Sequence, residues 1–254
     1  MRSIELAVRY GREIADPEVE SHEKNLRYGE LNWRLPLAET ALVLVDCWEY
    51  FPLESFVARA AEICKGKIRP VLSVCRELGI TVVHAPSPIW AANYPQFHYR
   101  LEPQGASDPA APDWPPPIDD ALAIPRTGSE PVYKAWWENV FPDGLRISPH
   151  LEPAGDDVVL STGEELHALC RERGIKHLVY AGFATNICVL FRDYGVRAMS
   201  QRGYNILFLR DATTGVEGSE TVEDLGATRS AIFFIETKVG ASTTAEAFVE
   251  ACRA

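Results

Sequence analysis

The chain has 254 residues, 46% of them hydrophobic and 24% charged, and its formal net charge is -11 at pH 7. This length suits one large α/β domain with a substantial core. The acidic balance argues against a nucleic-acid partner, which requires clustered lysine and arginine. No apolar run approaches the ~20 residues that span a membrane, so no membrane partner is expected. Because the first residues lack a signal-peptide pattern and the six cysteines lack disulfide-scaffold density, the expected location is cytoplasmic.

Residues 1–38 are polar and broken by glycine and proline, which is typical of an N-terminal arm. The run 41–45 is continuously apolar, as in a parallel strand that is covered on both faces, and it ends at Asp46. Helical spacing of apolar residues predicts a helix over 68–78, and a second strand follows over 80–85. The arm is therefore followed by a β–α–β start of an α/β domain.

Residues 86–125 interrupt this alternation with many prolines among aromatic residues. A long irregular segment inside a compact domain is usually functional or disordered. The aromatic side chains favour an ordered lid or an interface, and a loop that covers the surface fits the pattern equally well.

After residue 155 the strand–helix alternation returns. Thr162 and Glu165 have the spacing of a capping box, which opens a helix that Gly174 ends. Repeated strand–helix units predict a parallel sheet with helices on both faces, in a single domain over 1–254. The remaining predicted strands are 177–181, 205–209 and 233–237, and the remaining predicted helices are 188–203, 222–232 and 243–251.

Cys188 is the candidate nucleophile. An apolar run ends at Gly182, a short polar turn follows, and a helical pattern begins at this cysteine. A helix N-terminus favours a thiolate, and the carboxyl ends of strands are where open α/β sheets bind ligands. The other five cysteines are expected to pack as small hydrophobic residues, since no pair has the C-x-x-C spacing of a zinc or redox site.

Three segments together resemble the isochorismatase-like cysteine hydrolases, which include N-carbamoylsarcosine, ureidoacrylate and biuret amidohydrolases. They are 42–51, where Asp46 follows a strand, the cysteine turn 182–189, and the strand exit 210–213. The resemblance covers about residues 40–240. It implies a three-layer α/β/α, Rossmann-like domain with a mostly parallel six-stranded sheet in the order 3-2-1-4-5-6. It also implies a homodimer or homotetramer.

The resemblance implies an Asp–Lys–Cys triad of Asp46, Lys134 and Cys188. The aspartate would take the thiol proton and later protonate the leaving amine. Residues 127–134 resemble the strand that ends in the catalytic lysine. However, residues 157–161 are also a good strand. If that segment is the third strand, Ser161 holds the lysine's position and the triad is incomplete.

The resemblance also implies a cis peptide bond between Phe183 and Ala184. It would aim the N–H groups of Ala184 and Cys188 at the developing oxyanion. Nicotinamidases bind a metal through histidines after the first strand, but no histidine stands there in this chain, so no metal is predicted. No Gly-rich fingerprint follows that strand, so no dinucleotide or other cofactor is predicted. The predicted walls of the substrate pocket are Trp48, Phe51, Phe183 and residues of the 86–125 segment, with Trp136 or Trp137 near Lys134 and Trp137 taken as the contact.

The leading hypothesis is hydrolysis of a C–N bond in a small amide, carbamoyl or ureide substrate through a Cys188 acyl-enzyme. A first alternative is the vinyl-ether hydrolysis of true isochorismatases, which does not use the cysteine. A second is a binding or assembly protein that has lost the lysine. A helix N-terminus and Lys134 beside Cys188 predict that the pKa of this thiol lies below its usual ~8.5.

Overall fold

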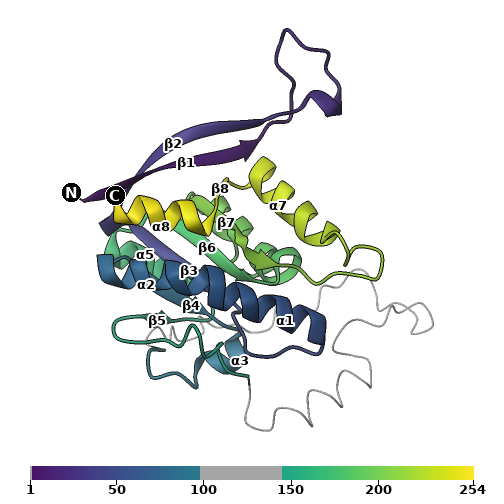
Figure 1. Ribbon diagram of the computed structural model, residues 1–254. Helices are drawn as coiled ribbons and strands as arrows, with labels where there is room; N and C mark the ends of the chain where they lie inside the picture. Colours follow the sequence, from purple (N-terminus) through teal and green to yellow (C-terminus); the bar gives the residue numbers. More distant parts are fainter. Residues whose placement is uncertain (1, 98–144) are drawn as a thin grey trace, which may run out of the picture. The chain divides into compact units, whose positions relative to one another are not determined.

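The computed structural model describes residues 2–97 and 145–254 (Figure 1). Within these ranges eight strands form one sheet in the order β2-β1-β8-β7-β6-β3-β4-β5. The strands from β8 to β5 are parallel to their neighbours, whereas β1 is antiparallel to both β2 and β8. The strands are β1 (Ser3–Gly11), β2 (Tyr28–Pro36), β3 (Thr40–Val45), β4 (Thr81–Ala85), β5 (Val158–Val159), β6 (His177–Phe183), β7 (Asn205–Thr214) and β8 (Ala241–Thr243).

Helices cover both faces of the sheet, as the strand–helix alternation predicts. One layer contains α1 (Glu54–Ile63), the π-turn η3 (Cys64–Ile68), α2 (Arg69–Leu78) and α8 (Ala245–Arg253). The other layer contains α5 (Gly163–Arg173), α6 (Val196–Gln201) and α7 (Gly226–Lys238). The short elements are η1 (Glu23–Asn25), η2 (Leu37–Glu39), α3 (Pro88–Ala91) and the π-turn η5 (Thr185–Val189).

The central strand β3 is buried along its whole length. Its side chains alternate between the layers: Leu42 and Leu44 pack with α2 and α8, and Val43 packs with α5 and α7. This two-sided burial explains the continuous apolar run in the sequence. β3 lies between β4 and β6, so the carboxyl ends of three parallel strands lie side by side.

The prediction of six strands is wrong, because residues 1–38 add a hairpin to the sheet. β1 and β2 pair from Ser3↔Pro36 to Gly11↔Tyr28, and Arg9 of β1 pairs with Ser242 of β8. Ile4, Leu6 and Val8 are buried, and the residues between them face away. Because only one face of the hairpin is apolar, its average composition is polar, and this composition led to the prediction of an arm instead of two strands.

The predicted strand at 233–237 is also wrong. These residues lie in α7, and the last strand is β8. Ala231 and Ile235 are buried four residues apart on one helix face, whereas Phe233 and Phe234 are exposed. A strand was predicted here because adjacent aromatic residues are enriched in strands.

The predicted helix at 188–203 is two separate elements, η5 and α6. The chain turns between them at Gly195, where a Cβ atom would lie 2.6 Å from the carbonyl oxygen of Val189. Helix α1 was not predicted. In contrast, Gly79 and Gly174 end α2 and α5 in the left-handed conformation. The Thr162–Glu165 capping box forms in both directions, at 3.2 and 3.0 Å.

Among the described residues, no helix is long and apolar enough to span a bilayer.

Candidate functional site

The cysteine turn connects the end of β6 to η5. The peptide bond between Phe183 and Ala184 is cis, which confirms this prediction. The N–H groups of Ile187 and Val189 then both donate to the carbonyl oxygen of Ala184, at 3.0 and 3.1 Å. These bonds close a single turn that contains Cys188, which is half-buried, whereas the other five cysteines are buried.

Glycine at position 182 allows the ends of β6 and β3 to approach each other. Gly182 has a φ of 118°, and a Cβ atom there would lie 2.1 Å from the carbonyl oxygen of Val45. A side chain would therefore push the two strands apart. The residues that follow them, Asp46 after β3 and the cysteine turn after β6, are brought together by this contact.

Polar side chains anchor the turn to the end of β7. The Thr213 hydroxyl donates to the carbonyl oxygen of Gly182 at 2.7 Å and lies 2.6 Å from the Thr185 hydroxyl. The Asn186 side chain bonds both backbone groups of Val216, at 2.8 and 3.0 Å. Thr213, in the 210–213 segment that the sequence marked only by resemblance, and Val216 after it thus fix the backbone around Cys188.

Asp46 is 4% exposed and adopts a left-handed backbone conformation, with a φ of 42°. Its Oδ2 atom lies 3.5 Å from Nη2 of Arg192, and its buried Oδ1 atom accepts no hydrogen bond from the described residues. Burial raises the pKa of Asp46 to about 6, although Arg192, the Cys188 thiol and the Ser87 N–H act against this rise. The carboxylate is therefore a base whose pKa lies close to neutral pH.

Burial and the charge of Asp46 raise the pKa of Cys188 to about 12, while Arg192 and the Ala184 N–H lower it. The prediction of a pKa below the usual value is therefore wrong for the environment that the described residues provide. Desolvation and a neighbouring carboxylate outweigh the helix terminus and the arginine. Above about pH 6 the pair consists of a carboxylate and a thiol, and the proton stays on sulfur until the thiol reacts.

Arg192 is a site residue that the sequence analysis missed. It lies one helical turn after Cys188, and its N–H donates to the Cys188 carbonyl oxygen at 3.1 Å. Its guanidinium reaches Asp46, and its Nε atom is buried without a hydrogen bond to any described residue. The i,i+4 spacing from Cys188 was the signal in the sequence, because residues so spaced share a helix face.

Residues 40–238 match the isochorismatase domain family. The chain belongs to the isochorismatase family. The ureidoacrylate amidohydrolase RutB of Caulobacter vibrioides is 28% identical over 223 residues, which cover 82% of this chain and 88% of that protein. RutB of Stutzerimonas stutzeri is 27% identical over 230 residues, covering 84% and 82%. A crystal structure of a cysteine hydrolase from Pseudomonas syringae pv. phaseolicola 1448A has a TM-score of 0.59 and 16% identity, covering 87% of this chain and 95% of that one. This last likeness concerns the fold alone.

Of the triad expected for an isochorismatase-family hydrolase, Asp46 and Cys188 lie together, and Lys134 lies outside the described residues. Residues 158–159 form the strand beside β4, so the condition under which Ser161 takes the lysine's position is met in the described part of the chain. Ser161 follows this strand, and its N–H and hydroxyl both bond the Glu165 carboxylate, at 2.7 and 3.3 Å. Ser161 thus belongs to the start of α5, and the lysine assignment stays a prediction.

The residues predicted to line the substrate pocket of this isochorismatase-family chain lie in different parts of the structure. Phe183 is 2% exposed, and its ring meets the Phe56 ring edge-on with centroids 6.2 Å apart. Phe51 lies on the other side of Phe56, with a centroid distance of 5.1 Å. Trp48 lines a hollow of about 250 Å³ beside α1 and residues 148–150. Trp137 lies outside the described residues.

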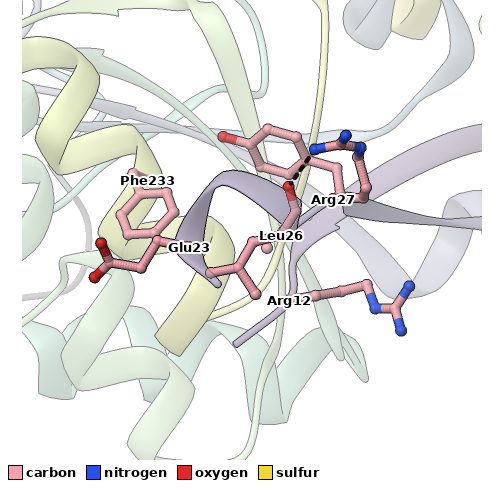
Figure 2. Close-up of a pocket in the computed structure, with 7 residues that line it drawn as sticks. Arg12, Glu23, Leu26, Arg27 and Phe233 are labelled. Carbon is pink, nitrogen blue, oxygen red and sulfur yellow. Dashed lines mark hydrogen bonds between the residues drawn. The ribbon is translucent and has the colours of Figure 1, made fainter. Parts of the chain in front are cut away.

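A further hollow of about 300 Å³ lies between the β1–β2 hairpin and α7 (Figure 2). Arg12 in its wall pairs with Asp16 at 2.6 Å, and Arg27 donates to the carbonyl oxygens of Lys24 and Leu26. Both guanidinium groups are thus used locally, and the described lining contains no cysteine or histidine. Nor do the described residues contain a group of three His, Cys, Asp or Glu placed to hold a metal.

Proposed function

We propose that the chain is a cysteine-dependent hydrolase that cleaves a C–N bond in a small amide, carbamoyl or ureide compound. The observation that carries this proposal is the buried carboxylate of Asp46 beside the thiol of Cys188, at the ends of adjacent parallel strands. Membership of the isochorismatase family and the amidohydrolase names of its relatives support the reaction class.

In the proposed first step, Sγ of Cys188 attacks the substrate carbonyl carbon while the Asp46 carboxylate takes the thiol proton. A pKa of about 12 means that the free thiolate is scarce at neutral pH, so the proton must leave during the attack. A nearby base with a pKa of about 6 is unprotonated at that pH and can accept it.

The oxyanion that forms would accept hydrogen bonds from the N–H groups of Ala184 and Cys188. The effect of the Ala184 N–H on the pKa of Cys188 supports this role, because that group already faces the sulfur. Collapse of the intermediate breaks the C–N bond, and Asp46 returns its proton to the leaving amine. Water then attacks the acyl-enzyme, Asp46 takes one proton of the water, and the thiol is regenerated. Lys134 is the proposed third member of the triad.

The test measures ammonia release from a panel of small amides and ureides by the wild type and by Cys188→Ala. Cys252→Ala, at a buried cysteine in α8, is the matched control. We expect activity in the wild type and in the control, and none in Cys188→Ala. Mass spectrometry of the quenched reaction should find the acyl group on the peptide that contains Cys188.

Isochorismate turnover, assayed in parallel, separates the alternatives. Turnover that survives in Cys188→Ala would favour vinyl-ether hydrolysis, which does not need the thiol. No activity in any variant, on either substrate class, would favour a binding or assembly protein. The proposed substrate contacts are Trp48, Phe51 and Trp137, whose rings suit a small, flat substrate.

We also propose that the protein works as a homodimer or homotetramer. Phe191 and Phe233 are 63% and 52% exposed, which supports an additional packing surface. Light scattering of the purified protein measures the mass directly, and a monomer at micromolar concentration would refute this proposal.

A further inference from the structure

Three observations single out Arg192, which lies in the turn between η5 and α6. Its Nη2 atom lies 3.5 Å from Oδ2 of Asp46, its Nε atom is buried without a partner among the described residues, and its side chain is still 33% exposed. The Asp46 carboxylate is far more buried, with a side-chain exposure of 2%. The guanidinium therefore extends from solvent into the site and ends at the carboxylate.

The other titratable groups that face Asp46 in the described part of the chain carry no positive charge. They are the thiols of Cys188 and Cys47 and the phenol of Tyr194, and burial raises the pKa of each. The Tyr194 hydroxyl is also bonded to the Pro86 carbonyl oxygen, at 3.3 Å. Asp193 is held elsewhere, because its carboxylate accepts the Gly163 N–H at 2.7 Å.

A buried carboxylate without a cation would take up a proton near neutral pH and could not act as a base. A close, bidentate arginine would have the opposite fault, since it would hold the carboxylate ionised but make it a poor proton acceptor. The single contact of 3.5 Å from a partly exposed guanidinium lies between these extremes.

We propose that Arg192 is a positioning residue that keeps Asp46 ionised and directed at Cys188, and so sets the pH above which the cysteine reacts. The role in catalysis rests on the proposed hydrolase function, but the effect of Arg192 on the Asp46–Cys188 pair does not. Its test can therefore use a reagent that needs no substrate.

The test measures the rate of Cys188 alkylation by iodoacetamide, an uncharged reagent, across a pH series, with peptide mapping to identify the site. The reactive form of the coupled pair carries one proton, so the rate should rise through the apparent pKa of Asp46, near pH 6. In Arg192→Gln we expect this rise to move up by about one pH unit or more, because an adjacent cation lowers a carboxyl pKa by roughly 1–3 units.

Arg192→Lys keeps a cation and should return the rise most of the way to its wild-type position. Arg197→Gln is the matched control, since Arg197 stacks on the rings of Phe191 and Phe234 and makes no contact with Asp46 among the described interactions. Thermal unfolding of each variant monitors folding. If Arg192→Gln does not fold, Arg192→Met, which keeps the length of the side chain and removes its charge, takes its place, with the same expected shift and the same contradicting result.

Three outcomes would overturn the inference: no rise near pH 6 in the wild type, an unchanged rise in Arg192→Gln, or an equal shift in Arg197→Gln. The alkylation rate of Arg192→Gln could rise at a higher pH although the wild type hydrolyses no amide or ureide. That result would support the role of Arg192 and refute the proposed function. Hydrolysis by the wild type, together with an alkylation rate that rises at the same pH in Arg192→Gln, would support the proposed function and refute the role of Arg192.

Discussion

Two buried aspartates in this molecule each face an arginine, yet their environments differ. The carboxylate of Asp157, just before β5, accepts hydrogen bonds from Arg76 at 2.5 Å and from the Ala154 N–H at 3.0 Å. It also lies 3.0 Å from Nε2 of His84. Burial alone would raise the pKa of Asp157, but these partners lower it to about 2. Asp157 is therefore a fully bonded group that stays charged down to about pH 2.

Asp46 lies two strands away in the same sheet. The Cys188 thiol and the Ser87 N–H face its carboxylate, its contact to Arg192 is long, and one oxygen has no hydrogen bond to the described residues. Its pKa is raised to about 6. Burial next to an arginine therefore does not fix the role of a carboxylate. The number and length of its hydrogen bonds decide whether the group stays charged or can exchange a proton.

The largest expected difference is in catalysis. Asp46→Asn should lower kcat by about 10³-fold, because it removes the proposed base, and a general base contributes roughly 10²–10⁴-fold. Asp157→Asn should leave kcat within a few-fold of wild type. Steady-state assays on the best substrate of the amide and ureide panel measure both. Equal losses in the two variants would remove the distinction between the aspartates.

For stability, the substitution of Asp157 should cause the greater loss. Asp157→Asn should lower the free energy of unfolding by about 3 kcal/mol, since breaking a buried pair leaves its partners uncompensated. Asp46→Asn should instead raise it by up to about 3 kcal/mol, because a pKa raised from ~3.9 to about 6 means that the ionised carboxylate destabilises the folded state at neutral pH. Urea unfolding at neutral pH tests this, and a greater loss in Asp46→Asn than in Asp157→Asn would contradict it.

The contributions of Asp157 and Asp46 to stability should change with pH in opposite directions. Asp157 has a lowered pKa in the folded state, so its contribution is present above the unfolded value of ~3.9 and is lost as pH falls toward 2. Asp46 has a raised folded pKa, so its contribution is present below ~3.9 and is lost as pH rises through about 6. Unfolding free energies of wild type and of each asparagine variant, measured from about pH 2 to 7, should give difference curves with opposite slopes.

The sequence predicts that Asp46 and Cys188 lie side by side but not their proton affinities. Asp46 and Cys188 each stand at the end of an apolar strand, and this local pattern is enough to place them at the carboxyl edge of a sheet. The sign of the shift in the pKa of Cys188 depends on burial and on a carboxylate from another strand, which no local pattern contains. The prediction of a lowered pKa, which assumed Lys134 beside the thiol, is therefore wrong for the surroundings that the described residues provide, and the role of Cys188 as nucleophile stays a proposal.

The elements that were predicted wrongly also depend on burial that a local pattern does not contain. The strand 41–45 is predictable because both of its faces are buried. The β1–β2 hairpin buries one face only, and residues 233–237 have strand-like side chains on a helix that is half exposed. Local patterns predict elements well where burial is complete, and less well where one face meets solvent.

The smallest expected effect concerns the anchoring of the cysteine turn. Thr213→Val removes the hydroxyl that bonds Gly182 and Thr185, and Thr40→Val removes a hydroxyl that bonds the Pro36 carbonyl oxygen at 2.8 Å. Both residues are buried, so each variant should lose about 1–2 kcal/mol of stability.

Only Thr213 holds the backbone next to Cys188, because Thr40 lies at the opposite end of β3 from Asp46. Thr213→Val should therefore also lower kcat several-fold and slow alkylation of Cys188, while Thr40→Val should change neither. Unfolding, turnover and alkylation measured on the same two preparations separate the effects. Similar kcat in both variants would mean that the hydroxyl network stabilises the fold without positioning the nucleophile.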